Sequence, residues 1–440
     1  MLLIYSENTS TRLQYTCRFI FEELLQMSFS LTLHQESFAL HEGPKINYSS
    51  KKIEGTYRIC PSGLLLEEGI SPQNIQSSGE GENAVLFRTE NADHPFDIFS
   101  AVFYLISRYE EYLPHEEDMY GRYAYENSIA FKAGFLNIPL VNVWVQELSK
   151  KAHAFFLQLS SGHKNTDETP TFNLQPSTFN FLPTYDIDMA WSYKEKGFLR
   201  SAGGFLRQPT LGRIAAWLGM REDPFDSYRF LDRIHSSSGL APLYFFLVAK
   251  NTGVYDKNIS PANESMQMLI REHAEKYTIG LHPSWKSNEE KELLAEEKDR
   301  LEKISGKSIT SSRQHYIKVL MPQNYRRLLG AGITDDYSMG YGSINGFRAS
   351  VASSFLWYDL TEEKITSLRV HPFCFMDANC FYEQKLSPEQ SYDELLHYYS
   401  ICKQVNGTLI TIFHNNFLGT DKAFAGWREL YTRFISQLQQ

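Results

Sequence analysis

The order of strand-like and helix-like segments after residue 178 constrains the fold of this 440-residue chain most strongly. Short apolar runs alternate there with longer segments of helical periodicity, and strands that alternate with helices are typical of parallel α/β sheets. The runs lie at 179–186, 242–249, 278–282, 309–316, 336–348, 368–375 and 408–414. Seven strands of this kind predict an α/β fold with a mainly parallel sheet, either doubly wound or closed as a barrel.

The chain before residue 160 is expected to form a smaller α/β unit. Residues 2–5 read as a buried strand and residues 11–26 as a helix, because their apolar positions follow strand-like and helical spacing. Further helices are expected from Asp97 onward and over 140–158, with Asp97 as an N-terminal cap. A strand followed at once by a helix indicates an α/β arrangement.

A change in composition marks the expected domain boundary. The stretch 160–178 turns polar and carries Gly, Pro, Asn and Thr, which favour loops. We therefore predict a first domain over 1–175, whose role the sequence leaves open, and a second domain over 176–440 that holds the seven strands.

Charge and cysteine content narrow the classes of partner. The chain carries 43 Lys and Arg against 52 Asp and Glu, with no Lys/Arg-rich run, so we expect no nucleic-acid partner. Its five cysteines are odd in number and never spaced as C-x-x-C, which favours reduced thiols in the cytoplasm. The N-terminus lacks a basic signal-peptide region, and no apolar run approaches the ~18 residues of a transmembrane segment. We therefore expect a cytoplasmic protein whose partner is neutral or small.

Polar residues collect where the expected strands end. Asp186 and Asp188 lie two residues apart, so the side-chain period of a strand puts both on the same side. In α/β barrels the carboxyl ends of the strands meet on one face, so polar residues far apart in sequence would converge there. The other residues at or just beyond the strand ends are His282, Arg313, His315, Arg348, His371 and His414.

Each of these residues also has a structural alternative. Asp186 and Asp188 would suit a turn whose carboxylates bind backbone N–H groups, and any one His or Arg would suit an ordinary buried hydrogen bond or ion pair. Asp and His together, however, supply the oxygen and nitrogen ligands that bind Zn²⁺ or a similar divalent ion. With a second carboxylate as base and a His as acid, these are the parts of a metal-assisted hydrolase.

Three stretches resemble motifs of the NodB-type polysaccharide deacetylases, carbohydrate esterase family 4. Residues 184–188 (Thr-Tyr-Asp-Ile-Asp) resemble the opening motif in its Asp-x-Asp form. Residues 279–284 resemble the second, His-containing motif, and residues 409–415 resemble the final strand that carries the acid His. The resemblance covers about residues 178–440 and implies a distorted (β/α)₇ barrel, in agreement with the seven strands expected above.

The resemblance also implies roles for individual residues. Asp186 would be the general base and His414 the general acid. The family's third motif has an Arg that orients the base, and Arg313 would fill this role, with Arg348 as the rival.

The metal ligands that the resemblance implies are Asp188 and His282, but the second motif departs from the family pattern. Where the family has another His four residues after the first, this chain has Lys286, whose protonated amine is a poor ligand. His315 is therefore a candidate third ligand. The alternatives are the hydroxyls of Ser284 and Ser287. Weak metal binding or loss of catalysis would be the other consequences of this departure.

The whole chain resembles a branch of this family, common in Bacteroidetes-type bacteria, in which a domain of unknown function precedes the barrel. Residues 97–101 (Asp-Ile-Phe-Ser-Ala) and 107–112 (Ser-Arg-Tyr-Glu-Glu-Tyr) are typical of that leading domain. The charged residues of the second stretch would form ion pairs at a solvated helix end or dock onto the barrel.

These features together predict a metal-dependent hydrolase that removes acetyl groups from an N-acetylated amino sugar or a glycan precursor. The resemblance implies a divalent metal, with zinc first and nickel, cobalt or manganese as alternatives. The competing interpretations are a catalytically inactive, carbohydrate-binding relative of the barrel and a metal hydrolase of another amide or C–N substrate. Trp285 would either stack on a sugar ring or pack in the core. The sequence leaves the sugar, the acyl group and the oligomeric state open.

Overall fold

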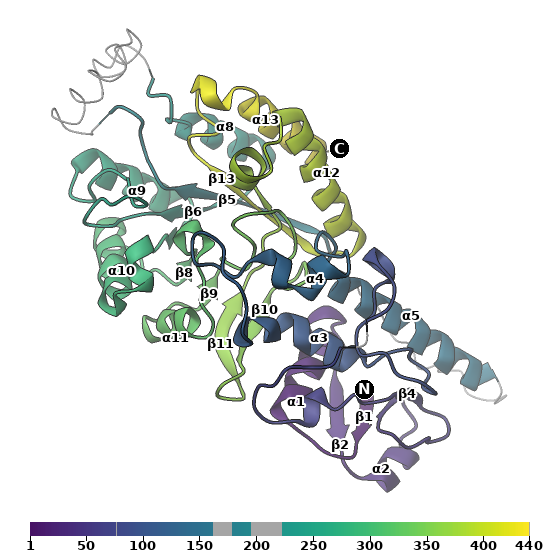
Figure 1. Ribbon diagram of the computed structural model, residues 1–440. Coiled ribbons are helices and arrows are strands. Elements are labelled where there is room, and N and C mark those ends of the chain that lie inside the picture. The colour runs from purple at the N-terminus through teal and green to yellow at the C-terminus, as the bar shows by residue number, and fades with distance from the viewer. Residues whose placement is uncertain (76, 162–177, 195–221, 440) are drawn as a thin grey trace. The chain divides into compact units, whose positions relative to one another are not determined.

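The computed structural model describes residues 1–75, 77–161, 178–194 and 222–439. Contacts between residues divide the chain into two compact units, whose elements Figure 1 shows. The first unit contains Met1–Asn180, Gly346–Pro372 and Ile401–Thr408. The second unit contains Phe181–Asn345, Phe373–Ser400 and Leu409–Gln440. The predicted boundary between residues 175 and 176 lies outside the described residues.

The first unit is built on a parallel sheet with the strand order β2-β1-β3-β4. The strands are β1 (Leu2–Ser6), β2 (Phe29–Thr32), β3 (Lys45–Tyr48) and β4 (Tyr57–Ile59). Because β1 pairs in parallel with both β2 and β3, it is an inner strand, and all of its residues except Leu3 are buried. The buried strand predicted at the start of the chain is therefore confirmed.

The helices of the first unit pack in sequence-distant pairs, α1 on α3 and α3 on α5. The elements are α1 (Thr11–Cys17), which continues as a π-helical segment (Arg18–Leu24), α2 (Gln35–Leu40), α3 (Ile98–Ile106), α4 (Ile129–Lys132) and α5 (Leu140–Ser161), with the antiparallel pair β10 (Phe355–Asp359) and β11 (Lys364–Val370). The carboxylate of Asp97 accepts a hydrogen bond from the backbone N–H of Ser100 at 3.1 Å. The predicted N-terminal cap of α3 is thus confirmed.

The second unit contains a parallel sheet in which the strands follow the order β9-β8-β7-β6-β5-β13-β12. The strands are β5 (Asn180–Ile187), β6 (Leu243–Phe246), β7 (Thr278–Leu281), β8 (Ser311–Ser312), β9 (Asp335–Asp336), β12 (Phe375–Met376) and β13 (Thr408–His414). Parallel ladders join β5 to β6, β6 to β7, β7 to β8, β8 to β9 and β12 to β13. The predicted parallel α/β class is therefore correct, while closure into a barrel stays a prediction.

Along the sequence of the second unit, helices alternate with the strands. Figure 1 shows α9, α10 and α11 beside the strands, in the green part of the chain. They are α8 (Tyr228–Ser238), α9 (Glu264–Lys276), α10 (Lys291–Ser305), α11 (Gln323–Gly330), α12 (Pro388–Gln404) and α13 (Trp427–Leu438). Both α9 and α10 contact β7. Each buries apolar side chains, such as Leu269 on α9 and Leu301 on α10, as expected of amphipathic helices that cover a sheet.

The pairing register of the strands places Asp186, Asp188 and His282 on one face of this sheet. Asp186 on β5 lies opposite Phe245 on β6, which lies opposite Gly280 on β7. Since side chains alternate along a strand, Asp188 and His282 continue the rows of Asp186 and Gly280. The same face carries part of a buried apolar cluster, made of Leu243, Phe245, Ile317, Tyr337, Phe373, Met376, Ile410 and Ile412.

The described residues include no helix that combines the length and the low polarity needed to cross a lipid bilayer.

Candidate metal centre

The carboxyl ends of the strands bring the predicted residues of the second unit together. Asp188 follows β5, His282 follows β7, and His414 is the last residue of β13. His315 follows β8 by three residues, because the strand predicted over 309–316 ends at Ser312 and residues His315–Ile317 form a 3₁₀ turn. Neighbouring parallel strands thus deliver side chains from distant segments to one place.

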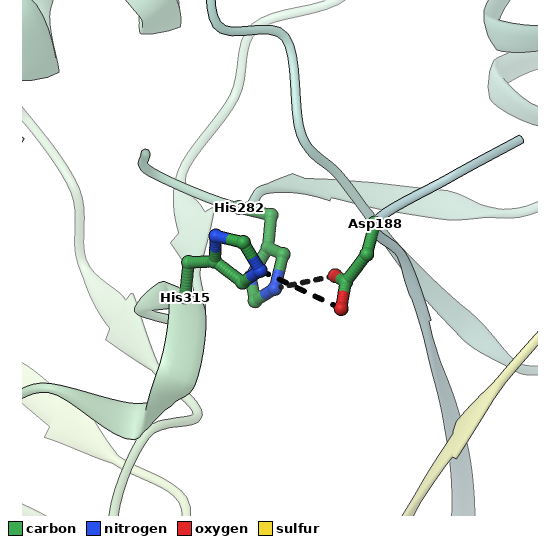
Figure 2. Close-up of side chains that lie close together, drawn as sticks. All are labelled: Asp188, His282 and His315. Carbon is green, nitrogen blue, oxygen red and sulfur yellow. Dashed lines mark ion pairs between the residues drawn. The ribbon is translucent and has the colours of Figure 1, made fainter. Parts of the chain in front are cut away.

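Asp188 is the centre of this cluster (Figure 2). Its carboxylate oxygens lie 3.0 Å from Nε2 of His282 and 3.5 Å from Nε2 of His315. One ligand atom from each of the three residues lies within 4.8 Å of the others. Zn²⁺ binds His nitrogen and Asp oxygen at about 2.0–2.2 Å, so donor atoms gathered this closely can share one ion.

The Nδ1 atoms of His282 and His315 each have a hydrogen-bond partner in the protein. Nδ1 of His282 lies 2.5 Å from the carbonyl oxygen of Arg313, and Nδ1 of His315 lies 2.9 Å from Oδ1 of Asp256. Both partners are acceptors, so in the neutral imidazole Nδ1 carries the proton and donates it. The lone pair of each ring is then on Nε2, facing Asp188, which is the arrangement that metal-bound histidines adopt.

The Oδ1 atom of Asp188 supports this reading of the cluster. It is buried and accepts no hydrogen bond from any described residue, although Nε2 of His282 lies 3.0 Å away. With the proton of His282 on Nδ1, the lone pairs of Nε2 and Oδ1 face each other across this distance, an arrangement that a shared cation stabilises. The donor types and their second contacts therefore fit a divalent ion.

Asp186 lies beside the cluster and is held by Arg313. Both side chains are almost fully buried, and Nη1 of Arg313 donates to Oδ1 of Asp186 at 2.9 Å and to Oγ1 of Thr184 at 2.7 Å. Nε of Arg313 donates to the carbonyl oxygen of Tyr337, and its guanidinium lies over the ring of Phe245. In this arrangement Oδ2 of Asp186 lies 3.8 Å from Nε2 of His282.

His414 faces the cluster from the other side. Its Nδ1 lies 2.6 Å from Oδ1 of Asp377, and its Nε2 lies 3.5 Å from Oδ2 of Asp188. Asp377 also accepts the backbone N–H of His414 at 2.7 Å, so this carboxylate fixes both the ring and the strand end that carries it. The imidazole is thereby presented to the cluster through Nε2.

The carboxylates determine the charge of these imidazoles. Burial would lower the pKa of His414, but Asp377 and Asp188 outweigh burial and raise its pKa to about 10. For His315, Asp188 and Asp256 likewise outweigh burial and raise the pKa to about 9. Burial would raise the pKa of Asp188, yet the neighbouring His315 and His414 hold it well below its usual range. Without a metal ion, His315 and His414 are therefore imidazolium ions paired with carboxylates.

The structure places the other sequence candidates elsewhere in the fold. Arg348 belongs to the first unit, where its guanidinium donates to both carboxylate oxygens of Glu111 at 2.8 and 2.6 Å. The same carboxylate accepts Nε of Arg108, so Glu111 is shared by two buried arginines. His371 also belongs to the first unit, where Nδ1 lies 2.7 Å from Oγ of Ser354.

The position that the family motif gives to a second His is exposed here. Lys286 lies in a short 3₁₀ turn (Trp285–Asn288), and its side chain is exposed. The hydroxyl of Ser287 donates to the carbonyl oxygen of Ser284. Among the candidates for a third ligand, His315 is the one that the fold brings to Asp188 and His282.

Sequence reasoning missed the two carboxylates that hold the imidazoles. Asp377 directly follows the short strand β12, so the rule that directs attention to strand ends would have found it. Asp256 lies in the segment between β6 and α9, well after the strand end, and nothing in its local sequence marks it. Its role follows only from its contact with His315.

Comparison with known proteins gives one family match and several solved structures with some likeness. A family model described as "Family of unknown function (DUF7033)" matches residues 2–156. No curated protein matches the chain.

Solved structures with some likeness include proteins named as polysaccharide deacetylases from Mycobacterium smegmatis and from Pseudomonas aeruginosa PAO1, and the PuuE allantoinase. The first shares 13% identity at a TM-score of 0.39, over 59% of this chain and 85% of its own. The deacetylase from Pseudomonas aeruginosa shares 15% identity at a TM-score of 0.37, over 60% of this chain and 84% of its own. The allantoinase shares 12% identity at a TM-score of 0.38, over 60% of this chain and 84% of its own. All three TM-scores lie below 0.5.

Proposed function

We propose that this protein is a divalent-metal-dependent hydrolase that removes the acetyl group from an N-acetylated amino sugar or a glycan precursor. The observation that carries the proposal is the convergence of Asp188, His282 and His315 within 4.8 Å, with the ring nitrogens remote from Asp188 already bound. The resemblance of residues 184–188, 279–284 and 409–415 to deacetylase motifs agrees with it. From the same resemblance we infer that the second unit is a distorted (β/α)₇ barrel.

The roles of the ligands follow from their donor atoms. Asp188, His282 and His315 would hold the ion, with zinc as first choice and nickel, cobalt or manganese as alternatives. Such an ion would polarise the acetyl carbonyl and make water a stronger nucleophile. Asp256 and the carbonyl oxygen of Arg313 would keep both imidazoles in the tautomer that binds metal.

Two residues would move the protons of the reaction. The carboxylate of Asp186 accepts a proton from the water that attacks the acetyl carbon, while Arg313 holds this carboxylate in place. When the C–N bond breaks, Nε2 of His414 donates a proton to the departing amine nitrogen. Asp377 keeps Nδ1 of His414 engaged, so Nε2 alone is free to act. The products are acetate and the free amino sugar.

Acetate release from N-acetylated sugars, measured with and without added metal, tests the proposal. The wild type should release acetate only when a divalent ion is present. Asp186→Asn should lose turnover, because an amide cannot take the proton, yet should keep its bound metal. Asp393→Asn, which changes an exposed carboxylate on α12, is the matched control and should behave like the wild type.

Three results would contradict the proposal or one of its assignments. Turnover that survives in Asp186→Asn would remove this residue as the base. Absence of acetate release from every sugar tested, with retained sugar binding, would favour the non-catalytic binding protein, and hydrolysis of small cyclic amides alone would favour another C–N substrate.

A further inference from the structure

Three loops beside the candidate metal centre each carry an aromatic residue followed closely by a lysine. The loops lie after β6, after β7 and after β8. The pairs are Tyr255 with Lys257, Trp285 with Lys286, and Tyr316 with Lys318. We call these six residues the aromatic–lysine patch.

The three rings contact one another. The rings of Tyr255 and Trp285 stack with centroids 4.2 Å apart, and Tyr316 meets them edge-on at 5.2 and 5.3 Å. All three rings are half-buried, so part of each remains on the surface. Because the ring of Tyr316 is nearly perpendicular to the stacked pair, the three rings form a compact apolar platform whose exposed parts can contact another ring.

The platform is tied to the metal ligands. Oδ1 of Asp256 accepts the backbone N–H of Trp285 at 2.9 Å and also contacts Nδ1 of His315 at 2.9 Å. The ring of His315 lies 4.7 Å from the ring of Tyr316. One carboxylate therefore positions both a metal ligand and the platform, and a molecule that reaches the ion would lie next to the rings.

The loop after β8 is held in an uncommon conformation. Tyr316 and Ile317 have positive φ angles of 58° and 56°, which is rare for a β-branched residue such as Ile. Burial of Ile317 in the apolar cluster of the second unit holds the turn. The turn brings Tyr316 to the platform and allows Lys318 to reach it.

The lysines of the patch provide positive charge at the surface. Nζ of Lys318 lies 4.2 Å from the ring centroid of Trp285, a cation–π contact that restrains the ammonium. The side chains of Lys257 and Lys286 are exposed. None of the three lysines forms an ion pair with a carboxylate among the described residues, in a chain whose net charge is -9.

We propose that the aromatic–lysine patch binds the anionic group of the substrate, so that the hydrolase acts on an N-acetylated sugar that carries a phosphate or a carboxylate. This inference rests on the proposed function. The sugar or its neighbour lies on the rings while the lysines bind the anion, since an ammonium is a strong donor to phosphate and carboxylate oxygens. The acetyl group of the same molecule then faces Asp188.

Calorimetric titration compares binding of three probes to Asp186→Asn loaded with zinc, which should bind substrate without turning it over. The probes are N-acetylglucosamine, N-acetylglucosamine 1-phosphate, and a disaccharide of glucuronic acid and N-acetylglucosamine. We expect at least one charged probe to bind about tenfold more tightly than the neutral sugar, and added salt to reduce the difference. Each of Lys257→Gln, Lys286→Gln and Lys318→Gln should weaken charged-probe binding about two- to fivefold. Lys307→Gln, an exposed lysine after α10, should have no effect.

The outcomes separate the two proposals. Preference for the phosphate probe identifies a phosphorylated precursor, and preference for the glucuronyl probe identifies an acidic glycan. Equal binding of neutral and charged probes, or a preference that survives in the triple lysine variant, overturns the patch proposal, whereas acetate release by the wild type would still support the hydrolase. A lysine-dependent preference without acetate release from any probe would overturn the hydrolase and leave the patch as an anion-binding site.

Discussion

At the scale of single residues, Asp188 is the point on which three imidazoles converge. Nε2 of His282 lies 3.0 Å from its carboxylate, and Nε2 of His315 and of His414 each lie 3.5 Å from it. What distinguishes the three rings is the partner of Nδ1, which is a carbonyl oxygen for His282 and a buried carboxylate for the other two. These partners are the residues whose replacement should separate metal binding from proton transfer.

The first residue-scale prediction concerns Asp256. Asp256→Asn should weaken metal binding about ten- to a hundredfold, because the amide removes the negative charge that orients His315. Metal affinity measured by competition with a chelator checks this, with Asp393→Asn as the control. An affinity equal to that of the wild type would show that His315 needs no carboxylate partner, or is not a ligand.

The second residue-scale prediction concerns Asp377, which we regard as a positioning residue. Asp377→Asn should lower kcat about a hundredfold, because His414 loses the partner that fixes its ring and supports its charge. KM and metal content should stay close to wild type. Loss of metal together with kcat would instead assign Asp377 to the metal centre.

Much of this site could be predicted from the sequence because it follows strand ends. Asp188, His282 and His414 were identified in that way, and the fold brings them together. His315 also lies near a predicted strand end, and Lys286 at the position of a family ligand made it a candidate third ligand. Asp256 was not identified, since its contact with His315 depends on how a long loop folds back.

At the scale of secondary structure, the close approach of strands depends on a glycine. A Cβ atom on Gly280 of β7 would lie 2.5 Å from the ring of Phe245 and 3.0 Å from the carbonyl oxygen of Ser311. Phe245 in turn packs under the Arg313 guanidinium that holds Asp186. The position of the Phe245 ring therefore affects both the spacing of the strands at Gly280 and the placement of Arg313 beside Asp186.

Gly280→Ala should accordingly lower the free energy of unfolding by about 1–3 kcal/mol, the usual cost of an added methyl group in a packed core. Gly330→Ala at the end of α11 is the matched control, since a Cβ there would meet nothing within 4 Å. Urea unfolding of the three proteins measures the difference. Equal stability of Gly280→Ala and the wild type would show that β6 and β7 are packed less closely than described.

A buried His on α9 makes stability depend on pH. Burial lowers the pKa of His273 to about 4, and the opposing charges of Asp232 and Lys276 change this little. The unfolded chain, with an ordinary pKa near 6.5, takes up the proton first as pH falls, so stability is present above about pH 6.5 and is lost toward pH 4.

Between pH 7 and pH 5 this single imidazole should cost about 2 kcal/mol of the free energy of unfolding. In His273→Gln, the decrease in the free energy of unfolding between pH 7 and pH 5 should be smaller than in the wild type by that amount. In His397→Gln, which replaces an exposed His on α12, the decrease should equal that of the wild type. Urea unfolding at both pH values provides the measurement. The same pH dependence in His273→Gln and the wild type would contradict the assignment.

Element types were easier to predict than element ends. The helices predicted at 11–26 and 140–158 are present, and the strand Thr408–His414 has the predicted bounds. The apolar run 309–316 forms a ladder only at Ser311–Ser312, because the chain then turns through the positive φ angles of Tyr316 and Ile317. Strand β10 was missed, since its partner β11 lies across a short turn and the pair is antiparallel within an otherwise parallel pattern.

At the scale of the whole molecule, the sequence does not show which distant segments fold together. Residues 346–372 and 401–408 group with the N-terminal unit, although they lie among the strands of the second. The buried pair of Glu111 and Arg348 is one contact that links such segments within the first unit. A single boundary in the sequence cannot describe units that each consist of three separate segments.

The central claim is that Asp188, His282 and His315 hold a divalent ion, and the metal content of the purified protein tests it most directly. Zinc-loaded wild type, dialysed and measured by elemental mass spectrometry, should retain about one ion per chain, and Asp188→Asn should retain less than about a tenth of that. Asp393→Asn should match the wild type. A wild type that retains no zinc, nickel, cobalt or manganese, or an Asp188→Asn variant that retains as much as the wild type, would contradict the account.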